Sequence, residues 1–180
     1  MVPKAATRYA KAFLQFAIDE KMVNDIQNDI LRIQEMFESS DELMRFFKNP
    51  IIKKSDKAEV FKKLFKKDLR DQTFDFIHLI FDNDREQLLP EITTAFVDLY
   101  KEFAGIIDVS VSSAFSLTDK QIQKLNDTLE SATGKTVNLH FSVDPDLKGG
   151  IAVRIEDTVI DGTIKYKINQ LKNLFMEPAA

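Results

Sequence analysis

The stretch VDPDLKGGIAVRIEDTVIDGTIKYKI, from Val143 to Ile168, decides how the second half of the chain folds. It carries a pair of glycines, Gly149 and Gly150, beside alternating apolar residues, and acidic residues follow closely. The pattern is compatible with a phosphate-binding loop, a metal-binding loop or ordinary β structure. The choice among these three decides whether the chain carries the chemistry of an enzyme.

The paired glycines match neither of the common phosphate-binding motifs. A P-loop ends in Gly-Lys-Ser/Thr and leads into a helix, whereas Gly149 and Gly150 lead into the alternating residues 151–155. A dinucleotide-binding motif needs a third glycine, which is missing here. We therefore expect β architecture. One glycine should take a positive φ in a turn after Pro145, and the other should allow a bulge or a close backbone approach.

The acidic and histidine residues also lack the spacing of a chemical site. Glu156, Asp157 and Asp161 do not follow the pattern of a calcium loop. Glu156 and Asp157 are expected to form a turn between two short strands, and Asp161 is expected to cap the final helix. His78 and His140 belong to no metal or catalytic signature, and the chain has no cysteine. The sequence predicts no catalytic, cofactor-binding or metal-binding residue.

The residues around this stretch predict a small α+β domain over residues 106–180. IIDVSVSSAF alternates apolar and polar residues, as a half-buried strand does, and Thr118 can cap a helix that Gly134 ends. TVNLHFSV, GIAVRIE and TVI follow as further strands. The final helix carries Ile164, Ile168, Leu171 and Phe175 at spacings of four, three and four.

Residues 1–105 predict an all-helical domain, a bundle of six helices separated by short breaks. Ser40 and Ser55 are placed to cap the third and fourth helices, and the sixth is expected over about residues 84–104. Pro90 should lie in the first turns of that helix or at a kink, and Gly105 should end it. The fold class expected for the whole chain is therefore α+β.

Two of these helices, residues 4–20 and 71–82, carry more apolar surface than one buried face requires. In one interpretation both lie at the centre of the bundle. In the other, each buries one face and offers the opposite face to a partner helix, because a small bundle encloses few positions completely. The side chains expected on the partner-binding face are Tyr9, Phe13, Phe16, Phe74, Ile77 and Phe81.

Charge and hydropathy disfavour nucleic acid and the bilayer interior as partners. The net charge is −4, whereas nucleic-acid-binding domains are usually basic. The tract IKKSDKAEVFKKLFKK is rich in lysine, but its apolar residues follow a helical period. The simplest interpretation is that the lysines form the solvent-exposed face of a helix. No apolar run approaches the ~20 residues that span a bilayer. The N-terminus enters a helical pattern at once, so the pattern gives no reason to expect a leader segment.

Two motifs identify a family that the chain resembles. The first is R-Y-A-x-A near the start, present as Arg8, Tyr9, Ala10 and Ala12. The second is a P-x-L-x-G-G turn between strands followed by I-D-G before the last helix. It is present as Pro145, Leu147, Gly149, Gly150, Ile151, Val153, Ile155, Ile160, Asp161 and Gly162. Over its whole length the chain resembles the delta subunits of bacterial ATP synthases, counterparts of the mitochondrial oligomycin-sensitivity-conferring protein. Lys148 and Tyr166 depart mildly from the family pattern.

The resemblance implies a non-catalytic stator subunit of a proton-translocating rotary ATP synthase. In that family the helical domain grips the N-terminal helices of the alpha subunits, through its first and fifth helices. The C-terminal domain meets the end of the b subunits of the peripheral stalk. The resemblance also implies a peripheral protein on the cytoplasmic face of the cell's inner or plasma membrane, without cofactor, nucleic acid or direct membrane insertion. It implies that the glycine stretch is architecture and not a nucleotide site.

Overall fold

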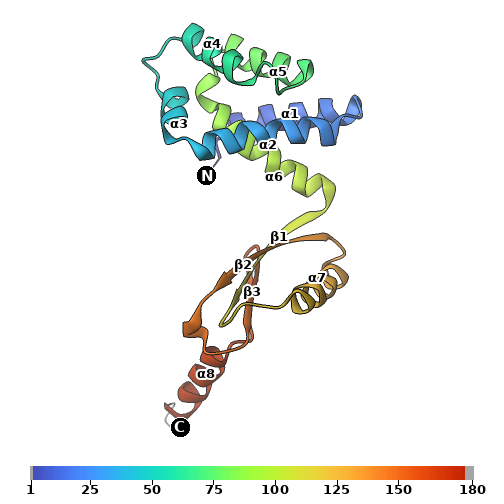
Figure 1. Ribbon diagram of the computed structural model, residues 1–180, viewed down its shortest axis with the longest axis vertical. Helices are drawn as coiled ribbons and strands as arrows, with labels where there is room; N and C mark the ends of the chain where they lie inside the picture. The colour runs from blue at the N-terminus through green and yellow to red at the C-terminus, as the bar shows by residue number, and fades with distance from the viewer. Residues whose placement is uncertain (1, 177–180) are drawn as a thin grey trace. The chain divides into compact units, whose positions relative to one another are not determined.

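The computed structural model describes residues 2–176 (Figure 1), and the chain folds into two compact units. The first unit runs through Phe103 and the second begins at Ala104. The first contains the helices α1 Lys4–Asp19, α2 Val23–Ser39, α3 Asp41–Lys48, α4 Lys54–Phe65 and α5 Asp71–Asp82, and all but the last residue of α6 Leu89–Ala104, with a 3₁₀ turn, η1 Glu86–Leu88, before α6.

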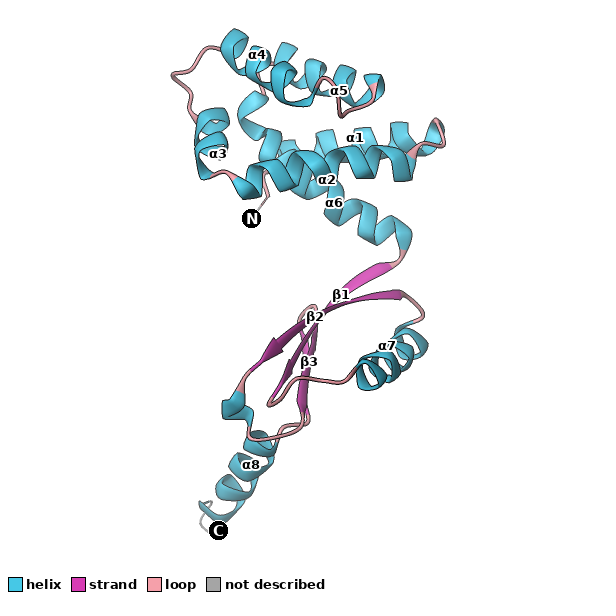
Figure 2. Cartoon of the chain, in the orientation of Figure 1, coloured by secondary structure: helices cyan, strands magenta, loops and turns pink. Residues whose placement is uncertain are grey.

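The second unit is a sheet with two helices (Figure 2). Its elements are β1 Ile106–Ser113, α7 Asp119–Thr133, β2 Thr136–Val143, the 3₁₀ turn η2 Pro145–Leu147, β3 Ile151–Ile155, β4 Thr158–Asp161 and α8 Ile164–Met176. The strand order is β2-β1-β3-β4. β1 and β2 are parallel and are joined by α7, the kind of crossover that parallel strands need, while the other pairs are antiparallel. The expected α+β class is confirmed.

Each unit has its own hydrophobic core. In the first, α1, α2, α5 and α6 supply most of the buried apolar side chains. In the second, Ile107, Val109 and Val111 of β1 are buried on one face of the sheet. Leu129 of α7 belongs to the same buried cluster, so α7 covers this face. The alternation of β1 in the sequence therefore corresponds to a strand with one buried face.

Most of the expected helix signals are confirmed, and three need correction. Ser40 caps α3, because its hydroxyl accepts the Leu43 N–H at 3.2 Å. Ser55 does not cap α4, because the helix already begins at Lys54 and the Ser55 hydroxyl donates to Asp56. The sixth helix begins later than expected, at Leu89, because a 3₁₀ turn precedes it. Pro90 thus lies in its first turn, where an N–H is not needed.

The cap of the final helix is the third correction. Asp161 ends β4, and its carboxylate accepts the N–H of Thr163, which lies before the helix. The Thr163 hydroxyl accepts the N–H of Tyr166 at 3.1 Å. Thr163 therefore performs the capping that the sequence assigned to Asp161.

The glycine turn is built as the sequence indicated, with one difference. Gly150 has φ +77°, and a Cβ placed on it would lie 2.4 Å from the carbonyl oxygen of Gly162. Both glycines of the pair therefore have a positive φ, +156° at Gly149 and +77° at Gly150, and the close backbone approach falls on Gly150. A Cβ on Gly149 would instead meet the Ile164 side chain at the start of α8. Lys148 also takes a left-handed φ of +64°, so the turn after Pro145 is made by consecutive residues of unusual backbone conformation.

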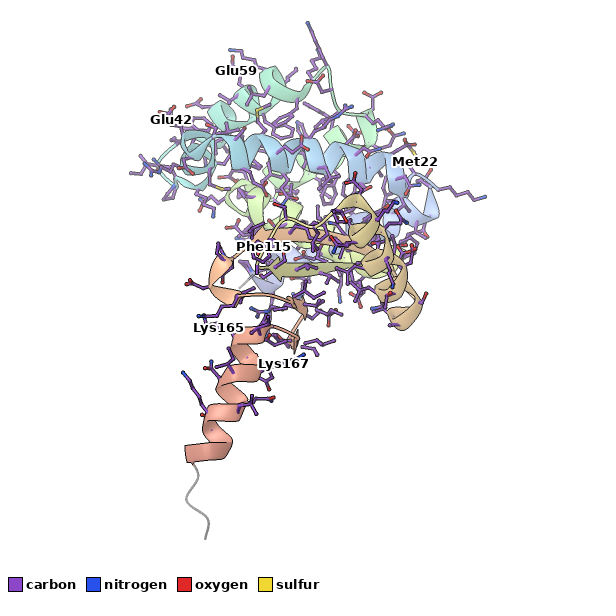
Figure 3. All side chains as sticks on the ribbon, turned by 60° about the horizontal axis from the view of Figure 1, so that its bottom comes forward. Met22, Glu42, Glu59, Phe115, Lys165 and Lys167 are labelled. Atoms are coloured by element: carbon purple, nitrogen blue, oxygen red, sulfur yellow. The ribbon has the colours of Figure 1, made fainter. Side chains whose placement is uncertain are left out.

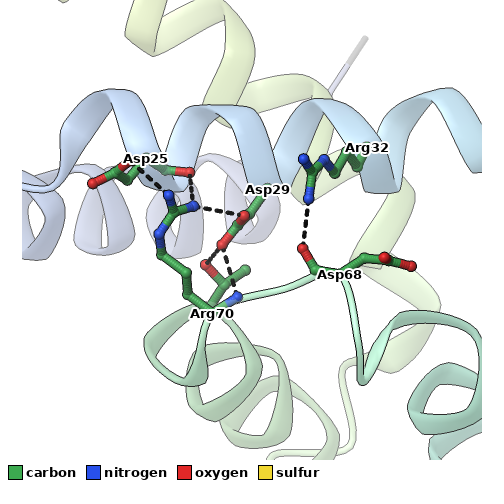
Figure 4. A network of polar contacts seen from close by, with 6 residues as sticks. Asp25, Asp29, Arg32, Asp68 and Arg70 are labelled. Atoms are coloured by element: carbon green, nitrogen blue, oxygen red, sulfur yellow. Dashed lines mark hydrogen bonds and ion pairs between the residues drawn. The ribbon is translucent and has the colours of Figure 1, made fainter.

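A buried carboxylate joins α2 to the start of α5 (Figure 4). Asp29 is fully buried and accepts hydrogen bonds from the Arg70 N–H, the Arg70 guanidinium and the Thr73 hydroxyl, at 3.1, 2.9 and 2.8 Å. The same guanidinium also donates to the side chain and the carbonyl of Asp25. Because every donor here is supplied by one short segment, the network fixes where α5 begins relative to α2.

A second buried ion pair lies between α4 and η1. The Lys57 ammonium is fully buried and lies 3.1 Å from a carboxylate oxygen of Glu86, which is itself nearly buried. The lysine that looks like part of a wet helix face in the sequence therefore points into the unit. Burial of a charged lysine is tolerated only when it is paired, and Glu86 supplies the pair.

Replacement of Gly150 by alanine should destabilise the second unit by more than about 2 kcal/mol, because the new Cβ meets backbone and the φ is left-handed. Gly134→Ala is the matched control, since Gly134 has φ +66° but open space around its Cβ, so about 1 kcal/mol is expected. Hydrogen exchange of the β1 and β3 amides measures the second unit alone. Equal losses of protection in the two variants would contradict the close-approach explanation.

Replacement of Asp29 by alanine should cost the first unit roughly 2–4 kcal/mol of unfolding free energy, because it removes three hydrogen bonds to a buried carboxylate. Asp25→Ala removes the same charge from the same arginine at a half-exposed position, so its cost should be about 1 kcal/mol or less. Urea denaturation followed by circular dichroism checks both. A loss in Asp29→Ala no larger than that of the control would contradict the anchoring role.

Candidate partner-binding site

An apolar groove of about 490 Å³ lies between α1 and α5. It is lined by Ala12, Phe13 and Phe16 from α1 and by Gln72, Asp75, Phe76 and Leu79 from α5. Both helices bury one side in the core, and the side that lines the groove is left uncovered. The groove therefore lies between the two helices that looked too apolar in the sequence.

The floor of the groove is a pair of stacked aromatic rings. The rings of Phe13 and Phe76 lie parallel, with centroids 3.8 Å apart. Phe13 is buried and also contacts Phe96 of α6, so the floor is continuous with the core of the unit. Phe76 is only half-buried. A rigid, preformed aromatic floor suits an incoming apolar side chain, because little ordering is needed on binding.

The rims of the groove carry apolar side chains that reach solvent. Phe16 is 40% exposed and Leu79 is 51% exposed. Ala12, one turn before Phe16 on α1, is small and exposed, so a partner backbone can approach closely there. Large exposed apolar side chains beside a groove are typical of an interaction site.

The six side chains expected on a partner face divide into three groups. Phe13 and Phe16 line the groove. Tyr9 and Phe74 are half-buried against the core and do not line it. Ile77 and Phe81 are 1% and 4% exposed, so these two are core residues and the expectation that they face a partner is corrected.

The period of α5 explains this correction and shows which residues were missed. Its buried side chains are Thr73, Ile77, Ile80 and Phe81, and its groove side chains are Gln72, Asp75, Phe76 and Leu79. Each set follows helical spacing. The partner face expected from the sequence includes Ile77 and Phe81, which are strongly apolar, but α5 carries apolar residues on both faces. Gln72 is polar, and Phe76 and Leu79 follow it at helical spacing. This spacing is the sequence signal that marks the groove face of α5.

Two polar side chains of α5 line the otherwise apolar groove. Gln72 and Asp75 are exposed, and within residues 2–176 neither side chain makes a hydrogen bond or an ion pair. They lie on the same face of α5, about one helical turn apart. A helix that fills the groove therefore meets one amide and one carboxylate that have no partner of their own in the described chain.

A second apolar surface lies on the C-terminal unit. α8 carries Ile164, Ile168 and Leu171 on one stripe, and these are 46%, 39% and 54% exposed. On the sheet, Phe141 and Ile160 are also exposed on the face that α7 covers only in part. α8 is attached to its unit through η2 and through Ile164 against Gly149. Its apolar stripe is thus left uncovered in the described chain.

A further polar cluster lies on the sheet of the second unit. On the open sheet face, His140 lies 3.3 Å from a carboxylate oxygen of Asp108, and Asn138 donates to the same oxygen. This cluster lies exposed on the sheet surface. Within residues 2–176 no group of three or more histidine, aspartate or glutamate side chains is arranged to hold a metal ion, and no helix is long and apolar enough to cross a membrane.

Two pKa shifts occur among the described residues, and both are away from the groove. The Asp84 carboxylate accepts a hydrogen bond from Lys54 and raises the pKa of that lysine. A hydrogen bond from Lys63 lowers the pKa of Glu59. Both are exposed surface pairs, and neither is placed for proton transfer.

Comparison with known proteins agrees with these observations. The family described as ATP synthase delta (OSCP) subunit matches residues 5–175. An ATP synthase subunit delta from Chlorobaculum parvum is 36% identical over 176 residues, 97% of each chain. One from Desulforudis audaxviator is 33% identical over 172 residues, 96% of this chain and 94% of that one.

The fold is also found in a solved structure. A chain in the cryo-EM structure of the Toxoplasma gondii mitochondrial ATP synthase hexamer has a TM-score of 0.73 and 15% sequence identity, and the match covers 98% of this chain and all of that one. The agreement covers both units. From the family match and the relatives together, the chain belongs to the ATP synthase delta (OSCP) subunit family.

Proposed function

We propose that this ATP synthase subunit is a non-catalytic stator link, held at one end by the alpha subunits and at the other by the b subunits. In this proposal the helices of residues 1–105 act as one six-helix bundle whose α1/α5 groove takes the N-terminal helix of an alpha subunit. The unit of residues 106–180 takes the end of the b subunits. The whole subunit then lies on the cytoplasmic face of the membrane as a peripheral component of the complex.

The observation that carries the proposal is the groove between α1 and α5. It is apolar, open along two helices and floored by the Phe13–Phe76 stack. An amphipathic helix binds such a groove with apolar side chains at positions i, i+3, i+4 and i+7. The family membership supports the proposal, because it makes the chain a subunit of ATP synthase, the complex to which the proposed alpha-subunit partner also belongs.

The proposed role sets a physical demand on this joint. A stator must stay bound through many turnovers of the rotor, so dissociation must be slow. Affinities near ~1 nM, about −12 kcal/mol, are the relevant scale. In interfaces of ordinary size, buried aromatic anchors carry most of the binding energy when the contacts around them exclude water. The floor and rims of the groove have this arrangement.

Charge insertion at the groove rim should separate binding from folding. Phe16→Asp and Leu79→Asp should keep the helical content and lose about 30-fold or more in affinity for a peptide of the alpha subunit's N-terminal helix, because both side chains are exposed rim positions. Phe13→Ala, a change at the buried floor, should lower the unfolding free energy by roughly 3–5 kcal/mol. Calorimetric titration and circular dichroism measure the two effects. Unchanged affinity in both rim variants would overturn the assignment of the groove.

Charge insertion on α8 should break only the other end of the link. Ile168→Asp with Leu171→Asp should let the subunit co-purify with alpha and beta subunits but not with b subunits. The assembled complex should still hydrolyse ATP while proton pumping falls, because the stator no longer holds the head. Val159→Asp is the matched control, an exposed apolar residue on the opposite face of the sheet. Retention of b subunits by the α8 variant would remove α8 from the interface.

A further inference from the structure

The groove helix α5 is acidic. Its residues Asp71–Asp82 include three aspartates and neither lysine nor arginine. Of these, Asp75 lines the groove itself, and it makes no ion pair within the described chain. Asp82 is paired with His78 outside the groove lining. A carboxylate at the edge of an apolar groove favours a partner with a cation at the matching position.

The C-terminal helix α8 has the opposite charge. Its residues Ile164–Met176 include three lysines and no acidic residue. At about 100° per residue, Lys165 and Lys172 flank the stripe of Ile164, Ile168 and Leu171 on one side, and Lys167 flanks it on the other. Figure 3 shows Lys165 and Lys167 projecting from α8. No ion pair of these lysines is found in residues 2–176.

Both surfaces offer apolar contacts, a groove between α1 and α5 and an exposed stripe on α8, so hydrophobicity alone separates their partners poorly. Each presents aliphatic and aromatic side chains at helical spacing and would accept an amphipathic helix. A like-charge contact at an interface disfavours the wrong partner, and an opposite-charge contact favours the right one. The difference in sign between Asp75 and the α8 lysines is therefore the feature that distinguishes the surfaces.

We propose that charge sorts the two partner helices: the groove selects a helix with a lysine or arginine opposite Asp75, and α8 selects an acidic amphipathic segment. This inference rests on the proposed stator function, in which each surface has its own partner. It goes beyond that function because it assigns the choice of partner to named residues. Apolar burial supplies most of the affinity at each surface, and the charges supply the discrimination and the salt dependence.

The test uses the full-length chain and two synthetic peptides, the N-terminal helix of the alpha subunit and the C-terminal segment of the b subunit from the same organism. Asp75→Lys should weaken the alpha peptide about tenfold and leave the b peptide unchanged. Lys165→Glu with Lys167→Glu should do the reverse. Lys120→Glu with Lys124→Glu is the matched control, because it makes the same charge change on exposed positions of α7. Raising the salt concentration should weaken both wild-type complexes.

The outcomes separate the charge proposal from the stator proposal. If wild-type protein binds both peptides and the charge variants bind equally well, charge sorting is wrong and the stator function stands. If wild-type protein binds neither peptide, the stator function fails and the sorting fails with it. Vesicles containing anionic lipid test the remaining partner of a basic amphipathic helix. Sedimentation with such vesicles that the two α8 lysine substitutions abolish, without binding of the b peptide, would overturn the acidic-partner assignment.

Discussion

A single buried carboxylate determines where the groove can form. Asp29 of α2 accepts hydrogen bonds from Arg70 and Thr73, which lie at the N-terminal end of α5. A buried carboxylate without these donors would be strongly unfavourable, so the donors are held close to it. This fixes the position and rotation of the first turn of α5. Phe76 and Leu79 follow on that helix, and their direction is therefore set by a contact that lies outside the groove.

The rotation of α5 divides its apolar residues between two tasks. Ile77, Ile80 and Phe81 turn toward the core, and Phe76 turns toward Phe13 of α1. The stack of Phe13 on Phe76 then forms the floor that separates the groove from the core. A helix that is apolar on nearly every side would otherwise favour complete burial. Here one side is kept at the surface because the polar residues Gln72 and Asp75 share it.

The sequence predicted the elements of this fold better than the faces that the elements present. Helical periods and strand alternation identified the α+β class, and the glycine pair identified the turn before β3. Hydropathy alone does not give the rotation of α5, because Phe74, Phe76, Ile77 and Phe81 are all apolar and hydropathy ranks them alike. The sequence marks the groove face only through the helical spacing of Phe76 and Leu79 from the polar Gln72, and the contacts of Phe76 with Phe13 and of Thr73 with Asp29 establish it. The sequence also did not predict the buried ion pair of Lys57 with Glu86, because the two residues are far apart in sequence.

The N-terminal cap of α8 affects the second apolar surface, which is the stripe on that helix. Thr163, and not Asp161, caps α8, so the helix begins at Ile164. That residue lies against Gly149, where any side chain would displace it. Gly150 beside it holds the backbone close to Gly162. The glycine pair therefore does more than make a turn, because it fixes where α8 starts and with it the direction of the stripe through Ile168 and Leu171. In the proposed stator link a fixed direction of this stripe matters, since a docking face that reorients under load would lose its contacts one at a time.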